Sequence, residues 1–285
     1  MNLRTVFLLC FAAACLPAVG WSVWIAAHAQ MQWVQARAAV QMASAMGDAL
    51  QLVEALSIER GALQERVLSD HQGVENLADV AARNDALLDR TQRSMLAAGL
   101  PDEAVTRARA MLIEARARIA EEIRHPLAER DSTLIPPMIQ HLNERLDEVE
   151  LAVARAEREA ALANASVGAV VAVGSLAVEM RSAAGRRSTY LSGWMGGQEI
   201  TPAHIEQSMY MTGEIQHAWE RLQRQVLIIG ESPRLVAAVA ATRAVFFGQS
   251  EPRYREVLAM ARTGAERPMP LIEWRRWTIE ALRGP

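Results

Sequence analysis

The chain has 285 residues, which is long enough for one large or two modest domains with a buried core. Hydrophobic residues make up 51% of it and charged residues 22%, which excludes a disordered chain. The net charge of −3 excludes an overall basic field of the kind that recruits nucleic acid. Aromatic residues make up only 5%, and the abundant Ala, Leu, Glu, Gln and Arg favour helices, so we expect an all-α fold.

An uncharged apolar segment, residues 5–27, begins just after the N-terminus. A helix of this length, at about 1.5 Å per residue, reaches across a hydrocarbon core of about 30 Å. Trp21, Trp24 and Trp33 lie at its outer end, where indole rings favour the membrane interface. We therefore expect a cytoplasmic N-terminus over residues 1–4, a transmembrane anchor over residues 5–27, and the rest of the chain outside the cytoplasm.

Three other interpretations of this segment stay open. Ala27-His28-Ala29 resembles a signal-peptidase site, although the apolar region of a cleaved signal is usually only about 7–15 residues long. Ala12–Cys15 resembles a lipoprotein cleavage box, and a buried soluble helix would also be apolar. Both cysteines, Cys10 and Cys15, lie inside the segment, which excludes a disulfide scaffold or a cysteine-ligated zinc site in the exported part.

A second uncharged window covers residues 160–178 and is just long enough to span a bilayer. Its residues are mainly Ala, Gly, Ser and Val, whereas insertion at the bilayer centre is favoured by Leu, Ile or Phe. Asn164 is also costly in that environment. We expect a tightly packed helix inside a bundle, and a second membrane span is the alternative.

Beyond the anchor, the sequence predicts successive helices that are separated by Gly and Pro. Gly99 and Pro101 end one of them. Thr201 caps another, which begins with Pro202. The expected helices cover residues 34–68, 74–98, 103–124, 136–194, 202–229, 235–247, 252–263 and 270–282.

An internal repeat sets the expected domain organisation. Aligning Gly61 with Gly185 superimposes two segments that each carry a polar-Gly-polar pattern within an apolar helix. A repeat of this length predicts two tandem antiparallel helical bundles. We expect the first bundle over residues 34–160 and the second over residues 161–285, joined by one long shared helix around residues 149–178.

The sequence lacks the residue patterns of common enzymes and metal sites. Its six histidines are far apart and never at a spacing of three or four, so no zinc motif forms. It contains no glycine-rich phosphate loop and no nucleophile elbow. We expect no enzymatic activity, no metal and no cofactor.

Two arginine-containing runs, Ile58–Gly61 and Ala184–Ser188, lie within apolar helices. An interior glycine costs about 1 kcal/mol relative to alanine and lets a second helix or a ligand approach closely. One interpretation is a close helix crossing whose arginines pair with Glu59, Glu65 or Glu179. The other is an anion pocket, because guanidinium groups bind planar oxyanions in a bidentate manner.

Helix geometry supports the choice of residues for such a pocket. Arg60 shares a helix face with Leu56 and Leu63, so its side chain projects into the bundle. Glu59 points about 100° away, so Arg60 needs another carboxylate or a bound anion. The candidate ligand-binding residues are Arg60, Arg186 and Arg187, followed by Arg181 and Arg66.

The run LVEALSIERGALQERVL, residues 52–68, resembles the opening helix of the nitrate- and nitrite-sensing domain family. Ala82–Asp85 resembles the Arg–Asp region in that family's second helix. Such domains occur outside the membrane in bacterial chemotaxis receptors, sensor kinases and diguanylate cyclases. The resemblance implies two stacked four-helix bundles that hold an anion by arginines between helices. At the second repeat, Ala184-Gly185 replaces the Glu-Arg-Gly of the motif.

We therefore expect a periplasmic ligand-sensing module that is anchored in the bacterial inner membrane by one N-terminal span. It would belong to a signal-transduction receptor of the methyl-accepting chemotaxis type, whose second membrane span and output domain follow this chain. The expected ligand is a small anion such as nitrate, nitrite or a small carboxylate, and the expected partner is a second copy in a homodimer. A single-pass envelope scaffold or interaction protein without a signalling output is the alternative.

Overall fold

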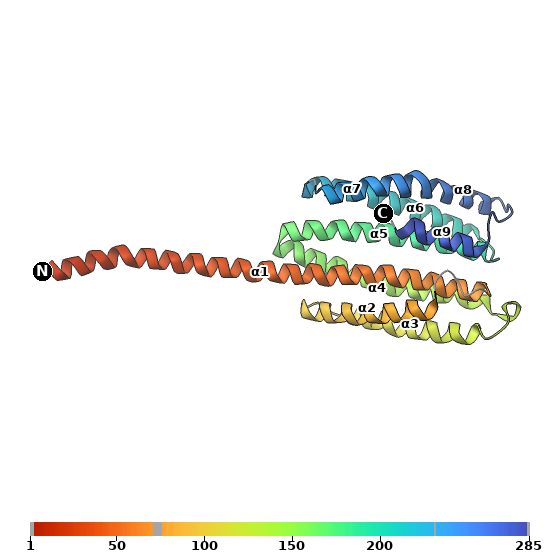
Figure 1. Cartoon of the computed structure of the whole chain (residues 1–285), viewed down its shortest axis with the longest axis horizontal. Coiled ribbons are helices and arrows are strands. Elements are labelled where there is room, and N and C mark those ends of the chain that lie inside the picture. The colour runs from red at the N-terminus through yellow and green to blue at the C-terminus, as the bar shows by residue number, and fades with distance from the viewer. Residues whose placement is uncertain (1–2, 71–75, 231, 284–285) are drawn as a thin grey trace.

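The computed structural model describes residues 3–70, 76–230 and 232–283, with the side chains of residues 3, 5–18, 163, 166 and 283 left aside. Within these ranges the regular elements are all helical and there is no strand, so the expected all-α fold is confirmed. The helices lie side by side as long rods, and α1 extends well beyond one end of the others (Figure 1).

Helix α1 covers Leu3–Leu68 and runs for 66 residues without a break. Residues 19–38 are exposed on every side of the helix, and Ala39 is the first buried position after them. From Ala45 onward, buried side chains recur every three or four residues and form the core-facing stripe of an amphipathic helix. The second half of α1 is therefore a core helix, whereas its first half makes the projecting rod of Figure 1.

Helices α2 (Leu77–Ala97), α3 (Glu103–Glu122) and α4 (Ile135–Ala163) pack beside the second half of α1. Gly99 closes the turn after α2 with φ 71°, a conformation that favours glycine. The short turns η1 and η2, at residues 127–129 and 132–134, join α3 to α4. Together the four helices enclose an apolar cluster that includes Met46, Leu52, Leu63, Leu88, Leu112, Ile119, Leu142 and Leu146.

The prediction of one long shared helix around residues 149–178 is wrong, because the chain reverses direction at Asn164. Helix α4 ends at Ala163, and helix α5 covers Ala165–Met195. The two helices pack against each other as an antiparallel hairpin (Figure 1). The window at residues 160–178 is thus divided between two helices instead of forming one straight span.

Two residues explain the reversal. Asn164 has an extended backbone, with φ −155° and ψ 107°, and its side-chain oxygen accepts a hydrogen bond from the backbone N–H of Val167. This bond caps the start of α5. Gly168 allows the tight return, because a Cβ atom there would lie 2.5 Å from Cα of Ala161.

Helix α6 covers Pro202–Ile229 and begins as the sequence predicts. The Thr201 hydroxyl accepts a hydrogen bond from the backbone N–H of His204, and the proline occupies the first turn. The helix ends before Gly230, which has φ 93°. The Thr201 cap and the Pro202 start are therefore confirmed.

The last part of the chain forms a helical run and a final helix. Helices α7 (Pro233–Thr242) and α8 (Glu251–Arg262) are joined by a π-helical stretch, Arg243–Ser250, so the two helices expected there form one continuous run. Helix α9 covers Leu271–Arg283 and packs against α5.

Helix α5 lies at the centre of the fold and contributes to three apolar clusters. Val171 joins the cluster of α1 to α4. Leu176 and Met180 pack with α6 and the π-helical stretch. Leu191 and Trp194 pack with α8 and α9. Residues on the two halves of α5 therefore connect the first four helices to the last four.

Among the residues whose side chains are described, one helical stretch is long and apolar enough to cross a membrane, judged by length and composition alone. That stretch is Val167–Met195 within α5, and 39% of its most apolar window is buried. The packing of α5 in three clusters accounts for this apolar character. The expected anchor, residues 5–27, falls in α1, but its side chains as far as residue 18 lie outside the described part, so the anchor stays a prediction.

Candidate functional site

Helix α1 carries a group of buried polar side chains between its apolar residues. Glu59, Arg60, Gln64 and Glu65 are each 1–3% exposed. Charged residues are almost never fully buried unless they are paired. The partners of these side chains therefore decide what this part of the molecule does.

Glu59 belongs to a polar network with α2 and α3. Its carboxylate accepts hydrogen bonds from Nε and Nη2 of Arg116, at 2.6 and 3.1 Å, and from the side-chain amide of Asn84 at 2.6 Å. Arg116 also pairs with Asp85 at 2.8 Å. Glu59 is thus fully occupied on the side of α1 that faces away from Arg60.

Glu65 pairs across the helices with Arg275 of α9, with 3.7 Å between Oε2 and Nε. The guanidinium of Arg275 passes directly over Gly61 of α1. A Cβ atom at Gly61 would lie 2.5 Å from both terminal nitrogens of Arg275. The interior glycine that the sequence singles out therefore makes room for an arginine from a distant helix.

Arg60 is buried with no carboxylate of the described residues within ion-pair distance. One of its terminal nitrogens donates to the side-chain oxygen of Asn143 on α4, and its Nε is buried with no hydrogen-bond partner. Among the described residues it forms no ion pair. Burial, together with the nearby guanidinium groups of Arg186 and Arg275, outweighs the opposing effect of the Glu150 carboxylate and lowers the pKa of Arg60 to about 9.

A small cavity of about 30 Å³ lies next to Arg60, between α1, α5 and α9. Three arginines from three helices line it, and no described carboxylate does. Gly61 and Gly185, the pair that the internal repeat aligns, both border it. The lining residues are Ser57, Ile58, Arg60, Gly61, Arg181, Gly185, Ser188, Thr189, Arg275, Thr278, Ile279 and Leu282.

Two of the candidate arginines have carboxylate partners outside the cavity. Arg181 lines the cavity with its side chain, pairs with Glu54 at 3.1 Å and donates to the backbone oxygen of Leu282. Arg186 points towards α4, where it pairs with Asp147 at 2.8 Å and with Glu150 at 3.6 Å. Arg186 is therefore near Arg60 without lining the cavity.

Arg187 takes part in a separate buried ion pair. Its two terminal nitrogens bind both oxygens of Glu251, at 3.0 and 2.6 Å, and its guanidinium lies 3.7 Å from the ring centre of Tyr254. Thr212 accepts a further hydrogen bond from it. This bidentate pairing neutralises the charge of Arg187, although its Nε is buried without a hydrogen-bond partner. Arg66 is half-buried near the end of α1 and does not line the cavity.

The close-crossing interpretation named the wrong carboxylates. Glu59 binds α3, Glu65 binds α9, and Glu179 pairs with Arg221 of α6. The candidate arginines on α5 pair instead with carboxylates of α1, α4 and α8.

Sequence reasoning missed Arg275 and Asn143. Arg275 is only 9% exposed although Arg276 follows it, and Trp274 before it is fully buried. An arginine beside a core tryptophan in an amphipathic helix was the available signal. Nothing in the sequence marks Asn143, because its role depends on the position of α4 relative to α1.

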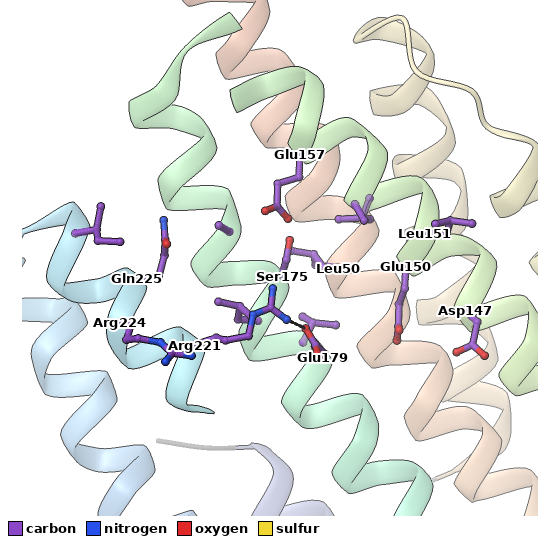
Figure 2. Close-up of a pocket in the computed structure, with 16 residues that line it drawn as sticks. Leu50, Asp147, Glu150, Leu151, Glu157, Ser175, Glu179, Arg221, Arg224 and Gln225 are labelled. Atoms are coloured by element: carbon purple, nitrogen blue, oxygen red, sulfur yellow. Dashed lines mark hydrogen bonds and ion pairs between the residues drawn. The ribbon is translucent and has the colours of Figure 1, made fainter. Parts of the chain in front are cut away.

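A larger groove of about 830 Å³ lies between α4, α5 and α6 (Figure 2). Its α4 wall carries Asp147, Glu150 and Glu157, and its α6 wall carries Arg221 and Arg224. Apolar residues of α1, α4 and α5 lie between the two walls. Burial raises the pKa of Glu150 at the edge of this groove.

Comparisons with known proteins identify no family for the chain. No protein-family model, no curated protein and no solved structure matches it. The resemblance of residues 52–68 to the nitrate- and nitrite-sensing family therefore rests on that motif, and the function has to be inferred from the geometry.

Proposed function

We propose that the chain is an extracytoplasmic sensor module of a membrane receptor and that the cavity between α1, α5 and α9 binds a small anion. The observation that carries the proposal is the content of the cavity, which is lined by Arg60, Arg181 and Arg275 and by no described carboxylate. A buried cation is costly unless it is paired. An anion in the cavity would offset the desolvation of Arg60 and receive hydrogen bonds from several guanidinium groups.

The volume of the cavity limits the ligand to a few heavy atoms. A cavity needs a volume of about 10–15 Å³ to hold one water molecule. The cavity volume of about 30 Å³ therefore suits an anion of the size of nitrite, nitrate or formate. A planar oxyanion also matches the fork of guanidinium donors. Larger dicarboxylates would require the helices to separate.

The exposed first half of α1 supports a membrane location. Val19, Trp21, Val23, Trp24 and Ile25 are 48–64% exposed. Soluble surfaces rarely expose a continuous apolar patch of this kind. We infer that this segment belongs to the N-terminal anchor in the bacterial inner membrane, with the helices beyond it in the periplasm.

The two-bundle organisation is part of the proposal. Helices α1 to α4 would form the first bundle, over residues 34–160, and α5 to α9 the second, over residues 161–285. The proposed site lies where α1 of the first bundle meets α5 and α9 of the second. An anion would draw the three arginine-bearing helices together by about 1–2 Å, and α1 would carry the shift to the membrane. Of the possible receptor types, we favour a chemotaxis receptor.

Calorimetry on the full chain in detergent micelles tests the proposal. Nitrate, nitrite and formate are titrated at constant ionic strength into the wild type, Arg60→Met and the control Arg158→Met, whose arginine is exposed on α4. We expect binding to the wild type and the control, and a loss of at least about tenfold in affinity for Arg60→Met. Unchanged binding by Arg60→Met would show that Arg60 is only structural and would refute the site.

A scaffold function is the second candidate. Leu151 and Ile228 border the large groove and are 53% and 73% exposed, as expected for a surface that holds a partner. A scaffold needs no ligand. A wild-type chain that binds none of the three anions would therefore favour the scaffold over the sensor.

A further inference from the structure

The two walls of the large groove carry opposite charges at regular helical spacing. On α4 the stripe consists of Asp147, Glu150, Leu151, Ala154 and Glu157. On α6 it consists of Arg221, Arg224, Gln225 and Ile228. Residues at spacings of three and four share one helix face, so each stripe is continuous along its helix. Figure 2 shows the acidic α4 side and the basic α6 side on either side of α5.

The two stripes do not pair with each other within one copy of the chain. Arg221 pairs with Glu179 of α5 at 3.4 Å. Asp147 and Glu150 pair with Arg186, which is also on α5. This leaves two charged side chains on opposite walls, Glu157 and Arg224.

Glu157 and Arg224 form no ion pair within the described part of the chain, although both line the groove. Apolar residues beside them are also uncovered, with Leu151 53%, Leu227 75% and Ile228 73% exposed. A surface that combines complementary charge with exposed apolar side chains is suited to association with another protein surface.

We propose that a second copy of this chain covers the groove, with the basic stripe of α6 in each copy facing the acidic stripe of α4 in the other. Such an interface is isologous, since each copy supplies both stripes. The inference gives a surface to the homodimer expected for the sensor and does not depend on anion binding.

The orientation of the two copies follows from the position of the two stripes along the helix axes. Both stripes border the same groove and so lie at the same level along the helices. A two-fold axis parallel to the helices keeps every residue at its own level and moves α6 opposite the other copy's α4. Both α1 helices then leave the dimer in the same direction (Figure 1), as anchorage in one membrane requires.

Charge reversal on the full chain in detergent micelles tests this surface. Arg224→Glu and Glu157→Arg each place like charges opposite each other, and we expect each to weaken dimerisation at least about tenfold in sedimentation equilibrium. The double variant Arg224→Glu/Glu157→Arg puts opposite charges together again. We expect its dimer dissociation constant to return to within about threefold of the wild-type value.

Matched controls are available on the exposed side of α4. Arg158→Glu and Glu159→Arg make the same changes in net charge away from the groove and should leave the dimer unchanged. A monomeric wild type would overturn the proposal. So would a dimer that resists both reversals, or a double variant that fails to recover. None of these variants touches the arginine cavity, so anion binding measured in parallel separates a failure here from a failure of the sensor.

Discussion

Replacing Gly61 with alanine is the sharpest test of how α1, α5 and α9 meet. In an ordinary helix interior this change is favourable by about 1 kcal/mol. Here the new Cβ atom would lie 2.5–2.7 Å from the guanidinium of Arg275, which must move away. Glu65, at 2% exposure, would then lose a buried ion-pair partner.

The loss of the Glu65–Arg275 ion pair outweighs the gain in helix propensity. Removing one partner of a buried ion pair costs about 3–5 kcal/mol, against the gain of about 1 kcal/mol in helix propensity. Arg275 is displaced by this change and not deleted, so the full cost applies only if its contact with Glu65 is lost completely. We therefore expect Gly61→Ala to destabilise the protein by up to about 4 kcal/mol and to lower its melting temperature by up to roughly 10 °C. Because Arg275 leaves the cavity, the affinity for anions should fall as well.

Gly47 provides the control within the same helix. A Cβ atom at Gly47 would meet nothing within 4 Å, so Gly47→Ala should raise the free energy of unfolding by up to about 1 kcal/mol. Thermal unfolding of both variants in micelles, followed by circular dichroism at 222 nm, gives the comparison. If Gly61→Ala melts above the wild type as Gly47→Ala does, the position of Arg275 over α1 is refuted.

Three further predictions concern charge and chain reversal. The folded chain lowers the pKa of Arg60 to about 9, so above that pH the unfolded chain binds more protons than the folded chain. The stability of the wild type relative to Arg60→Met should therefore rise as the pH increases beyond about 9. Unfolding titrations at pH 8 and pH 10 measure this, and a stability difference that stays constant contradicts it. Glu251→Gln leaves Arg187 buried without its carboxylate and should cost about 3 kcal/mol or more in denaturant unfolding, whereas a cost below about 1 kcal/mol would mean that the pair is not buried. Gly168→Ala forces a Cβ atom against the backbone of Ala161 and should cost about 2 kcal/mol or more, and a variant as stable as the wild type would argue against the tight hairpin.

Helix boundaries were predictable where the chain marks them with local chemistry. Thr201 and Pro202 begin α6, and Gly99 ends the turn after α2, because caps and left-handed glycines act over a few residues. The reversal at Asn164 was missed, since its Ala-rich surroundings favour a continuous helix. It depends on Gly168 passing Ala161, a contact that only the packed hairpin creates.

The candidate site was predictable only in part, for a related reason. The helix face of Arg60 follows from its spacing to apolar neighbours, and its burial is confirmed. Arg187 was assigned to the same group from sequence proximity, whereas the structure places it against Glu251. Arg275 lies 215 positions beyond Arg60 in the sequence, so only the tertiary fold brings them to one cavity.

The unbroken length of α1 gives the molecule a lever arm. From Gly61 at the cavity to Ala27 at the end of the expected anchor, the helix rises about 50 Å at 1.5 Å per residue. A tilt of only about 1° around the cavity would therefore move the far end sideways by about 0.9 Å. Because residues 19–38 are exposed and no described part of the chain buries them, little would damp this motion along the projecting half of α1. A small rearrangement of guanidinium groups would thus appear at the far end of α1 as a sideways displacement of the helix.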